Sequence, residues 1–173
     1  MKKRDLEEIL RAASRLTQET EFFIIGSQAV HAWSKRVLAE VLLSRECDLY
    51  PKSRQEAADL LNLRLGRSSA FARRHGFYAD VVTPEIATLP KGWQSRLKSL
   101  RAGKVKALCL EIHDLIVSKL AAGRLKDFEL VGALLQKNVA DIKVLRRRIA
   151  QLPLKTDRTR LRIRLKLLLD ELR

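Results

Sequence analysis

Phe-Phe-Ile-Ile-Gly-Ser, residues 22–27, is a short apolar run closed by a glycine and a serine. Such a run followed by glycine is typical of a buried strand that ends in a turn. Ser27 then stands where its hydroxyl can cap a helix over residues 28–38. The start of the chain therefore predicts a strand, a tight turn and a helix in that order.

The segments on either side extend this pattern into an alternation of helices and strands. Apolar residues recur at helical spacing before the run, and further strands and helices follow it. The expected order is helix 4–17, strand 22–25, helix 28–38, strand 47–50, helix 53–61, strand 77–82, strand 105–110, and then helices 113–122, 126–136, 142–152 and 161–172. This order predicts an α+β fold, with a mixed β-sheet flanked by helices over residues 1–110 and a helical C-terminal part over residues 111–173.

The composition is that of a compact globular protein and not of a membrane-spanning or disulfide-stabilised one. A chain of 173 residues with 46% hydrophobic residues is long enough for one compact core with a helical appendage. No apolar run approaches the ~20 residues that cross a bilayer, and the basic N-terminus leads into an amphipathic pattern. Cys47 and Cys109 have no CxxC spacing, which excludes a disulfide framework. We expect a cytoplasmic protein without membrane contact.

The positive charge is large and unevenly distributed. The net charge is +15; residues 91–106 hold six basic and no acidic residues, and residues 141–173 hold 11 basic and four acidic ones. Clusters of this kind favour a polyanion as partner, because each neutralised phosphate releases counterions. The alternative is a solubilising surface with no specific partner. Aromatic residues are only 5% of the chain, which disfavours a protein that binds single strands by base stacking.

Carboxylates lie on two of the expected strands. Glu46 and Asp48 flank Cys47, and residues two apart in a strand point to the same face. Two carboxylates in an apolar segment repel each other, and a bound Mg²⁺ or Mn²⁺ relieves that repulsion. Asp80, on the next strand, can complete a two-metal site. Each carboxylate taken alone also fits a solvated strand edge.

The turn at Gly26-Ser27 suits a phosphate. A glycine lets the backbone approach an anion closely, and the helix that follows presents amide donors. The sequence contains no HExxH motif, which disfavours zinc hydrolysis, and none of the motifs GxxxxGK[ST], GxGxxG and GxSxG.

These motifs together resemble the polymerase-beta-like nucleotidyltransferase superfamily: an apolar strand, Gly-Ser, a helix, an acid-x-acid strand and a third acid on a later strand. Residues 114–127, Asp-Leu-Ile-Val-Ser-Lys-Leu-Ala-Ala-Gly-Arg-Leu-Lys-Asp, are similar to a segment of AbiEii-like, toxin-type bacterial nucleotidyltransferases. The resemblance covers residues 20–136. It implies a nucleotidyltransferase-like core whose active-site cleft is completed by the helical part.

The resemblance also implies roles for individual residues. Gly26 and Ser27 would contact the triphosphate of an NTP, and Lys119 would neutralise its phosphates. Arg124 would contact a phosphate or pair with an acid. Glu46, Asp48 and Asp80 would hold the metal, and Asp127 would shape the site. Without the resemblance, Lys119 fits a salt bridge to Asp114 or another acid, and Asp127 fits an interaction with a helix dipole.

Three functions follow as hypotheses. The first is a metal-dependent enzyme that moves an NMP from an NTP to a nucleic acid, with tRNA as the first candidate and an antitoxin as protein partner. The second is a catalytically silent module of the same fold that binds nucleic acid or a protein, since Glu46 stands where the family usually has aspartate. The third, a transferase for cationic small molecules, is disfavoured by the basic surface.

Overall fold

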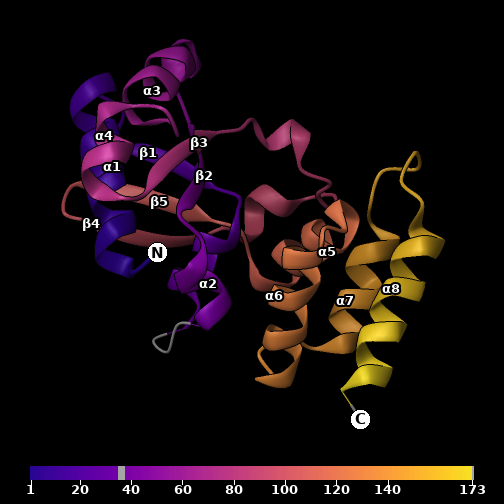
Figure 1. The fold of residues 1–173 in the computed structure, drawn as a ribbon. Helices are drawn as coiled ribbons and strands as arrows, with labels where there is room; N and C mark the ends of the chain where they lie inside the picture. The colour runs from indigo at the N-terminus through magenta and orange to yellow at the C-terminus, as the bar shows by residue number, and fades with distance from the viewer. Residues whose placement is uncertain (35–37, 173) are drawn as a thin grey trace. The chain divides into compact units, whose positions relative to one another are not determined.

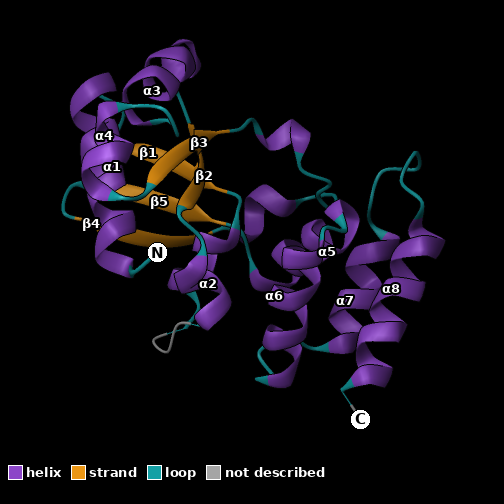
Figure 2. Cartoon of the chain, in the orientation of Figure 1, coloured by secondary structure: helices purple, strands orange, loops and turns teal. Residues whose placement is uncertain are grey.

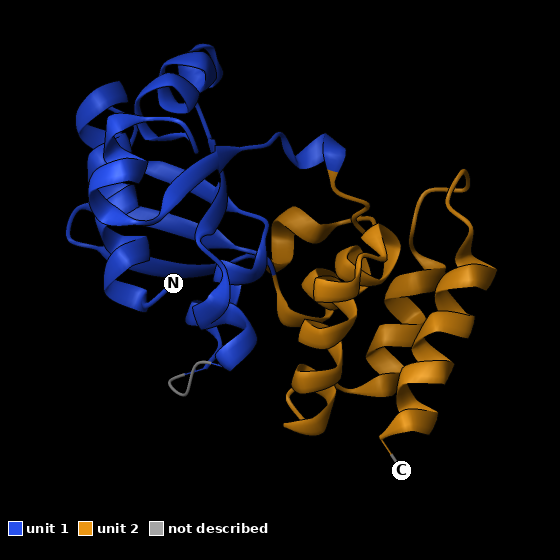
Figure 3. Ribbon diagram, in the orientation of Figure 1, with its two compact units in different colours: residues 1–86, 97–110 blue, residues 87–96, 111–173 orange. Residues whose placement is uncertain are grey.

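A computed structural model describes residues 1–34 and 38–172 of the chain (Figure 1). The chain divides into two compact units (Figure 3). Unit 1 consists of residues 1–86 and 97–110, and unit 2 of residues 87–96 and 111–173. In the described ranges, no helix combines the length and the apolar character that crossing a membrane requires.

Unit 1 is built on a five-stranded mixed sheet (Figure 2). The strand order is β3-β2-β1-β5-β4; β1 runs parallel to β5 and antiparallel to β2, β2 is parallel to β3, and β4 is antiparallel to β5. The strands are β1 (Glu21–Ile24), β2 (Glu46–Pro51), β3 (Tyr78–Val81), β4 (Lys98–Ala102) and β5 (Val105–Cys109).

The register separates an apolar face of this sheet from a polar one. Phe22 and Ile24 of β1 share a face with Leu49 of β2 and with Ala107 and Cys109 of β5, and all five are buried. Helices α1 (Lys3–Thr17) and α3 (Ala58–Leu65) contact the sheet, and the same core includes their buried leucines, Leu6, Leu10, Leu61 and Leu65. On β2 and β3, Glu46, Asp48, Tyr78 and Asp80 of the opposite face are only partly buried or exposed. We call this opposite face the polar face.

The helices of unit 1 are short apart from the first. They are α1 (Lys3–Thr17), α2 (Ala39–Leu43), α3 (Ala58–Leu65) and α4 (Ala70–His75), with 3-10 turns at Ser27–Ala32, Gln55–Ala57 and Pro84–Ile86. Ser69 caps α4 by accepting a hydrogen bond from the Ala72 amide at 3.0 Å. Gly76 ends it with φ of 79°, a conformation that glycine adopts without strain.

Unit 2 is helical. A 3-10 turn at Trp93–Arg96 is followed by α5 (Ile112–Ala122), α6 (Leu125–Gln136), α7 (Ile142–Ala150) and α8 (Arg158–Glu171). Acidic N-caps begin three of these helices: Glu111 for α5, Asp141 for α7 and Asp157 for α8. Gly123 ends α5 with φ of 67°, and a Cβ there would lie 2.4 Å from Nη1 of Arg164. That guanidinium donates to the Leu120 carbonyl at 2.6 Å.

The α+β class predicted from the sequence is confirmed, but several local elements differ from the prediction. Helices α2 and α4 were not expected, and the predicted helix 53–61 is a 3-10 turn over Gln55–Ala57 followed by α3. The strand β4 was not expected, because only Leu100 and Ala102 of its residues are buried. The predicted helix 28–38 is a 3-10 turn over Ser27–Ala32, and residues 35–37 lie outside the described residues. Gly26, not Ser27, is the N-cap of that turn, and its hydrogen bonds involve no capping side chain.

Candidate functional site

The turn after β1 lies directly against β2. The Ile25 amide donates to the Asp48 carbonyl at 3.1 Å, which brings the end of β1 to the middle of β2. A Cβ on Gly26 would lie 1.8 Å from Oδ2 of Asp48 and 2.5 Å from its Cγ. Only glycine fits here without moving the carboxylate. Ser27 follows, and its hydroxyl accepts from the Gln28 amide group at 3.4 Å.

The three predicted acids lie on the polar face of the sheet. Along β2, Cys47 and Leu49 are fully buried, and Glu46 and Asp48 therefore point to the other side. Asp80 of β3 stands opposite Asp48 in the parallel register and is exposed. The fold thus places Asp48 and Asp80 side by side, with Glu46 two residues along the same strand.

Tyr78 joins this group and was not singled out in the sequence. It stands opposite Glu46 in the register, and its hydroxyl donates to Oε2 of Glu46 at 3.4 Å. Burial raises the pKa of Tyr78, and the charge of Glu46 adds to the rise, so the phenol stays a neutral donor. Period-two spacing from Asp80 would have pointed to Tyr78.

These carboxylates suit a hard cation that draws other ligands from its substrate. In residues 1–34 and 38–172, no group of three or more His, Cys, Asp or Glu side chains is arranged to hold a metal ion. Mg²⁺ commonly takes one or two carboxylates and completes its shell with phosphate oxygens and water. The facing pair of Asp48 and Asp80 fits that mode, with the Asp48 carboxylate packed against Gly26.

In unit 2, Lys119 and Arg124 share one buried carboxylate. Asp127 is 1% exposed and accepts from Nε of Arg124 at 2.7 Å, and Nζ of Lys119 lies 3.3 Å from its other oxygen. Burial by itself raises the pKa of Asp127, but the hydrogen bond from Arg124 and the charge of Lys119 outweigh it, and the net shift is downward. The salt bridge considered for Lys119 therefore exists, and its partner is Asp127 and not Asp114.

We expect Asp127→Asn to destabilise unit 2 in a pH-dependent way. A depressed pKa means that the ionised form stabilises the fold above the unfolded pKa of about 3.9, and that this stability disappears as the pH falls through the folded pKa. The variant should lose about 1.5–3 kcal/mol near neutral pH and much less near pH 3. Urea unfolding at several pH values measures this. Glu129→Gln, an exposed acid on the same helix, is the control, and an equal deficit at every pH would contradict the prediction.

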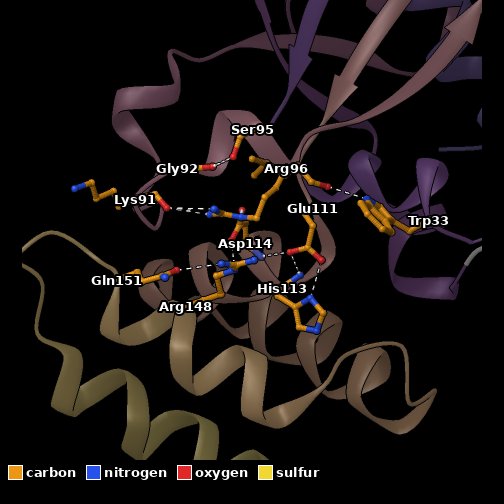
Figure 4. A network of polar contacts seen from close by, with 11 residues as sticks. Trp33, Lys91, Gly92, Ser95, Arg96, Glu111, His113, Asp114, Arg148 and Gln151 are labelled. Atoms are coloured by element: carbon orange, nitrogen blue, oxygen red, sulfur yellow. Dashed lines mark hydrogen bonds and ion pairs between the residues drawn. The ribbon is translucent and has the colours of Figure 1, made fainter.

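A second buried carboxylate, that of Asp114, links three segments of unit 2 (Figure 4). Asp114 is 0% exposed and lies 2.8 Å from Nε of Arg96 and 3.2 Å from Nε of Arg148. Burial raises the pKa of Asp114, and the hydrogen bond from Arg96 offsets part of the rise. Arg96 also donates to the Lys91 carbonyl, so Asp114 joins the 91–96 segment, α5 and α7.

The N-terminus of α5 is fixed by Glu111 and His113 (Figure 4). Glu111 accepts from the amides of His113 and Asp114 and lies 2.6 Å from Nδ1 of His113. The Asp141 amide donates to Nε2 of that imidazole at 2.9 Å, which assigns the ring proton to Nδ1. Burial by itself raises the pKa of Glu111. The hydrogen bond with His113 and the amide hydrogen bonds outweigh this effect, so the net shift of the Glu111 pKa is downward.

Fewer basic side chains of segment 91–106 are available to bind an anionic partner than its composition suggests. Arg96 is bound to Asp114, Nζ of Lys106 lies 3.0 Å from Glu21, and Nζ of Lys98 lies 4.3 Å from the centre of the Trp33 ring. Three of its six cations are therefore engaged within their own unit.

Residues 4–164 match the family described as "nucleotidyltransferase of unknown function" (DUF6036). No curated protein and no solved structure matches the chain. The match spans both units, from α1 into α8, and includes every predicted site residue. The chain therefore belongs to the DUF6036 family of nucleotidyltransferases of unknown function.

Proposed function

We propose that the protein is a metal-dependent nucleotidyltransferase that moves an NMP from an NTP to a nucleic acid, with tRNA as the first acceptor to test. The observation that carries the proposal is the position of Asp48. Its carboxylate lies against Gly26 on one side and stands in register with Asp80 on the other. Family membership supports the reaction class, and the basic C-terminal part supports a polyanionic acceptor.

The chain would contribute ligands and positioning. Asp48 and Asp80, with Glu46, would hold Mg²⁺ or Mn²⁺, which supplies charge stabilisation for the phosphate oxygens. The Gly26-Ser27 turn would contact the triphosphate, and the absence of a side chain on Gly26 lets the Asp48 carboxylate lie against this turn. Tyr78 would hold Glu46 in place and so compensate for its extra methylene relative to aspartate.

The transfer itself balances as an in-line displacement. An acceptor hydroxyl oxygen would form a bond to the α-phosphorus, and the bond from that phosphorus to the oxygen bridging to the β-phosphate would break. Pyrophosphate would leave with the bonding electrons. The exposed carboxylate of Asp80 would take the proton of the attacking hydroxyl.

Lys119, Arg124 and Asp127 are proposed to act on the phosphates and on the shape of the site. Arg124 and Lys119 both contact Asp127, so one carboxylate orients two cations. The similarity of residues 114–127 to AbiEii-like enzymes supports a toxin-type protein that a cognate antitoxin neutralises. These roles are the part of the proposal that rests on resemblance.

Calorimetry with ATP, GTP, CTP and UTP, with and without Mg²⁺ or Mn²⁺, tests the proposal. We expect metal-dependent binding of at least one NTP, followed by transfer of label from the α-³²P-NTP to tRNA with release of pyrophosphate. If the folded protein binds none of them with either metal, the enzyme reading fails. The silent nucleic-acid-binding module would then be the better description.

A further inference from the structure

The surface of unit 2 contains a hollow between α7 and α8 that faces solvent. Its volume is about 480 Å³, and it is lined by Arg146, Arg162, Leu165, Lys166, Leu169 and Asp170. We call these six residues the α7–α8 groove. Arg162 and Lys166 are four residues apart on α8, so they lie on the same side of the helix, about 6 Å apart along its axis. Arg146 enters from α7.

We propose that the α7–α8 groove is the docking surface for the ribose-phosphate backbone of the acceptor RNA. Arg146, Arg162 and Lys166 are exposed, and none of them forms an ion pair within the described ranges 1–34 and 38–172. Their charges are therefore presented to solvent, in contrast to Arg96 and Arg148, whose side chains are held by the buried Asp114.

The lining favours RNA over an acidic protein surface. Guanidinium groups bind phosphate oxygens through two parallel hydrogen bonds, and the groove brings two of them together with a lysine. Between the cations lie Leu165, which is buried, and Leu169, which is partly buried. They form an apolar floor against which a sugar or base can pack while the cations reach the phosphates.

This inference rests on the proposed function for the identity of the acceptor, but its test does not require catalysis. Binding of a fluorescein-labelled tRNA transcript is measured by anisotropy over a salt series, with Mg²⁺ and without NTP. The groove variant is Arg146→Gln/Arg162→Gln/Lys166→Gln. Its charge-matched control is Lys3→Gln/Arg64→Gln/Arg74→Gln, three exposed cations of unit 1. Urea unfolding of both variants establishes that they are folded.

We expect the groove variant to bind tRNA at least about tenfold more weakly, with a log–log salt slope shallower by about 2, while the control changes much less. Equal losses in both variants, or no tRNA binding by the wild type, would overturn the inference. Competition for the groove by poly-glutamate as effective as competition by unlabelled RNA would also overturn the inference, because the groove would then bind any polyanion. If tRNA binds through the groove but no label is transferred, the proposed transfer to tRNA fails, whereas the assignment of the groove as an RNA-binding surface stands.

Discussion

Asp48→Asn is expected to abolish metal-dependent NTP binding and to lower NMP transfer by at least about 10³-fold. The amide keeps the size of the side chain, so the contact with Gly26 remains, but it removes the negative charge that would hold the cation. The same change relieves repulsion between Asp48 and Asp80, which face each other across β2 and β3. Because Asp48 is only partly buried, stability should change by less than about 1 kcal/mol.

Calorimetry, the tRNA-labelling assay and urea unfolding on the same preparation check this prediction. Asp59→Asn is the matched control, since Asp59 is an exposed acid on α3 away from the predicted ligands. A loss of binding accompanied by a loss of stability would mean that Asp48 serves the fold. Unchanged metal-dependent binding would remove Asp48 from the metal site.

Most of the sheet could be predicted because its central strands are apolar on at least one face over several residues. Phe22 and Ile24, or Cys47 and Leu49, reveal a strand by composition and period alone. The edge strand β4 could not be found in this way. Its sequence, Lys-Ser-Leu-Arg-Ala, buries only Leu100 and Ala102, and its charges resemble a loop or a basic patch.

The same distinction applies to the functional residues: those set by local sequence patterns could be predicted, and contacts between residues distant in the sequence could not. Glu46, Asp48 and Asp80 could be placed on one face because strand periodicity is local and the order of the motifs resembles a known family. The partners of Asp114 could not, because Arg96 is 18 residues away and Arg148 approaches from a different helix. Ion pairs between different helices depend on how the helices pack, and a short stretch of sequence does not reveal that packing.

The second large effect is expected at Asp114, where removing the carboxylate should destabilise unit 2. Asp114→Ala would leave Arg96 and Arg148, each with a side chain only 19% exposed, next to each other without their shared counter-charge. The loss from breaking a buried ion pair in this way is about 3–5 kcal/mol. Glu129→Ala, at an exposed position of α6, should cost less than about 0.5 kcal/mol.

Tryptophan fluorescence can report the unfolding of unit 2 separately from that of unit 1. The chain has two tryptophans, Trp33 in unit 1 and Trp93 in unit 2, so a Trp33→Phe background leaves Trp93 as the reporter. The double variant Asp114→Ala/Arg96→Ala should be less unstable than the sum of the single variants, because much of the cost in Asp114→Ala is an arginine left without its partner. Strict additivity would mean that the Asp114–Arg96 contact contributes nothing beyond the packing of each side chain.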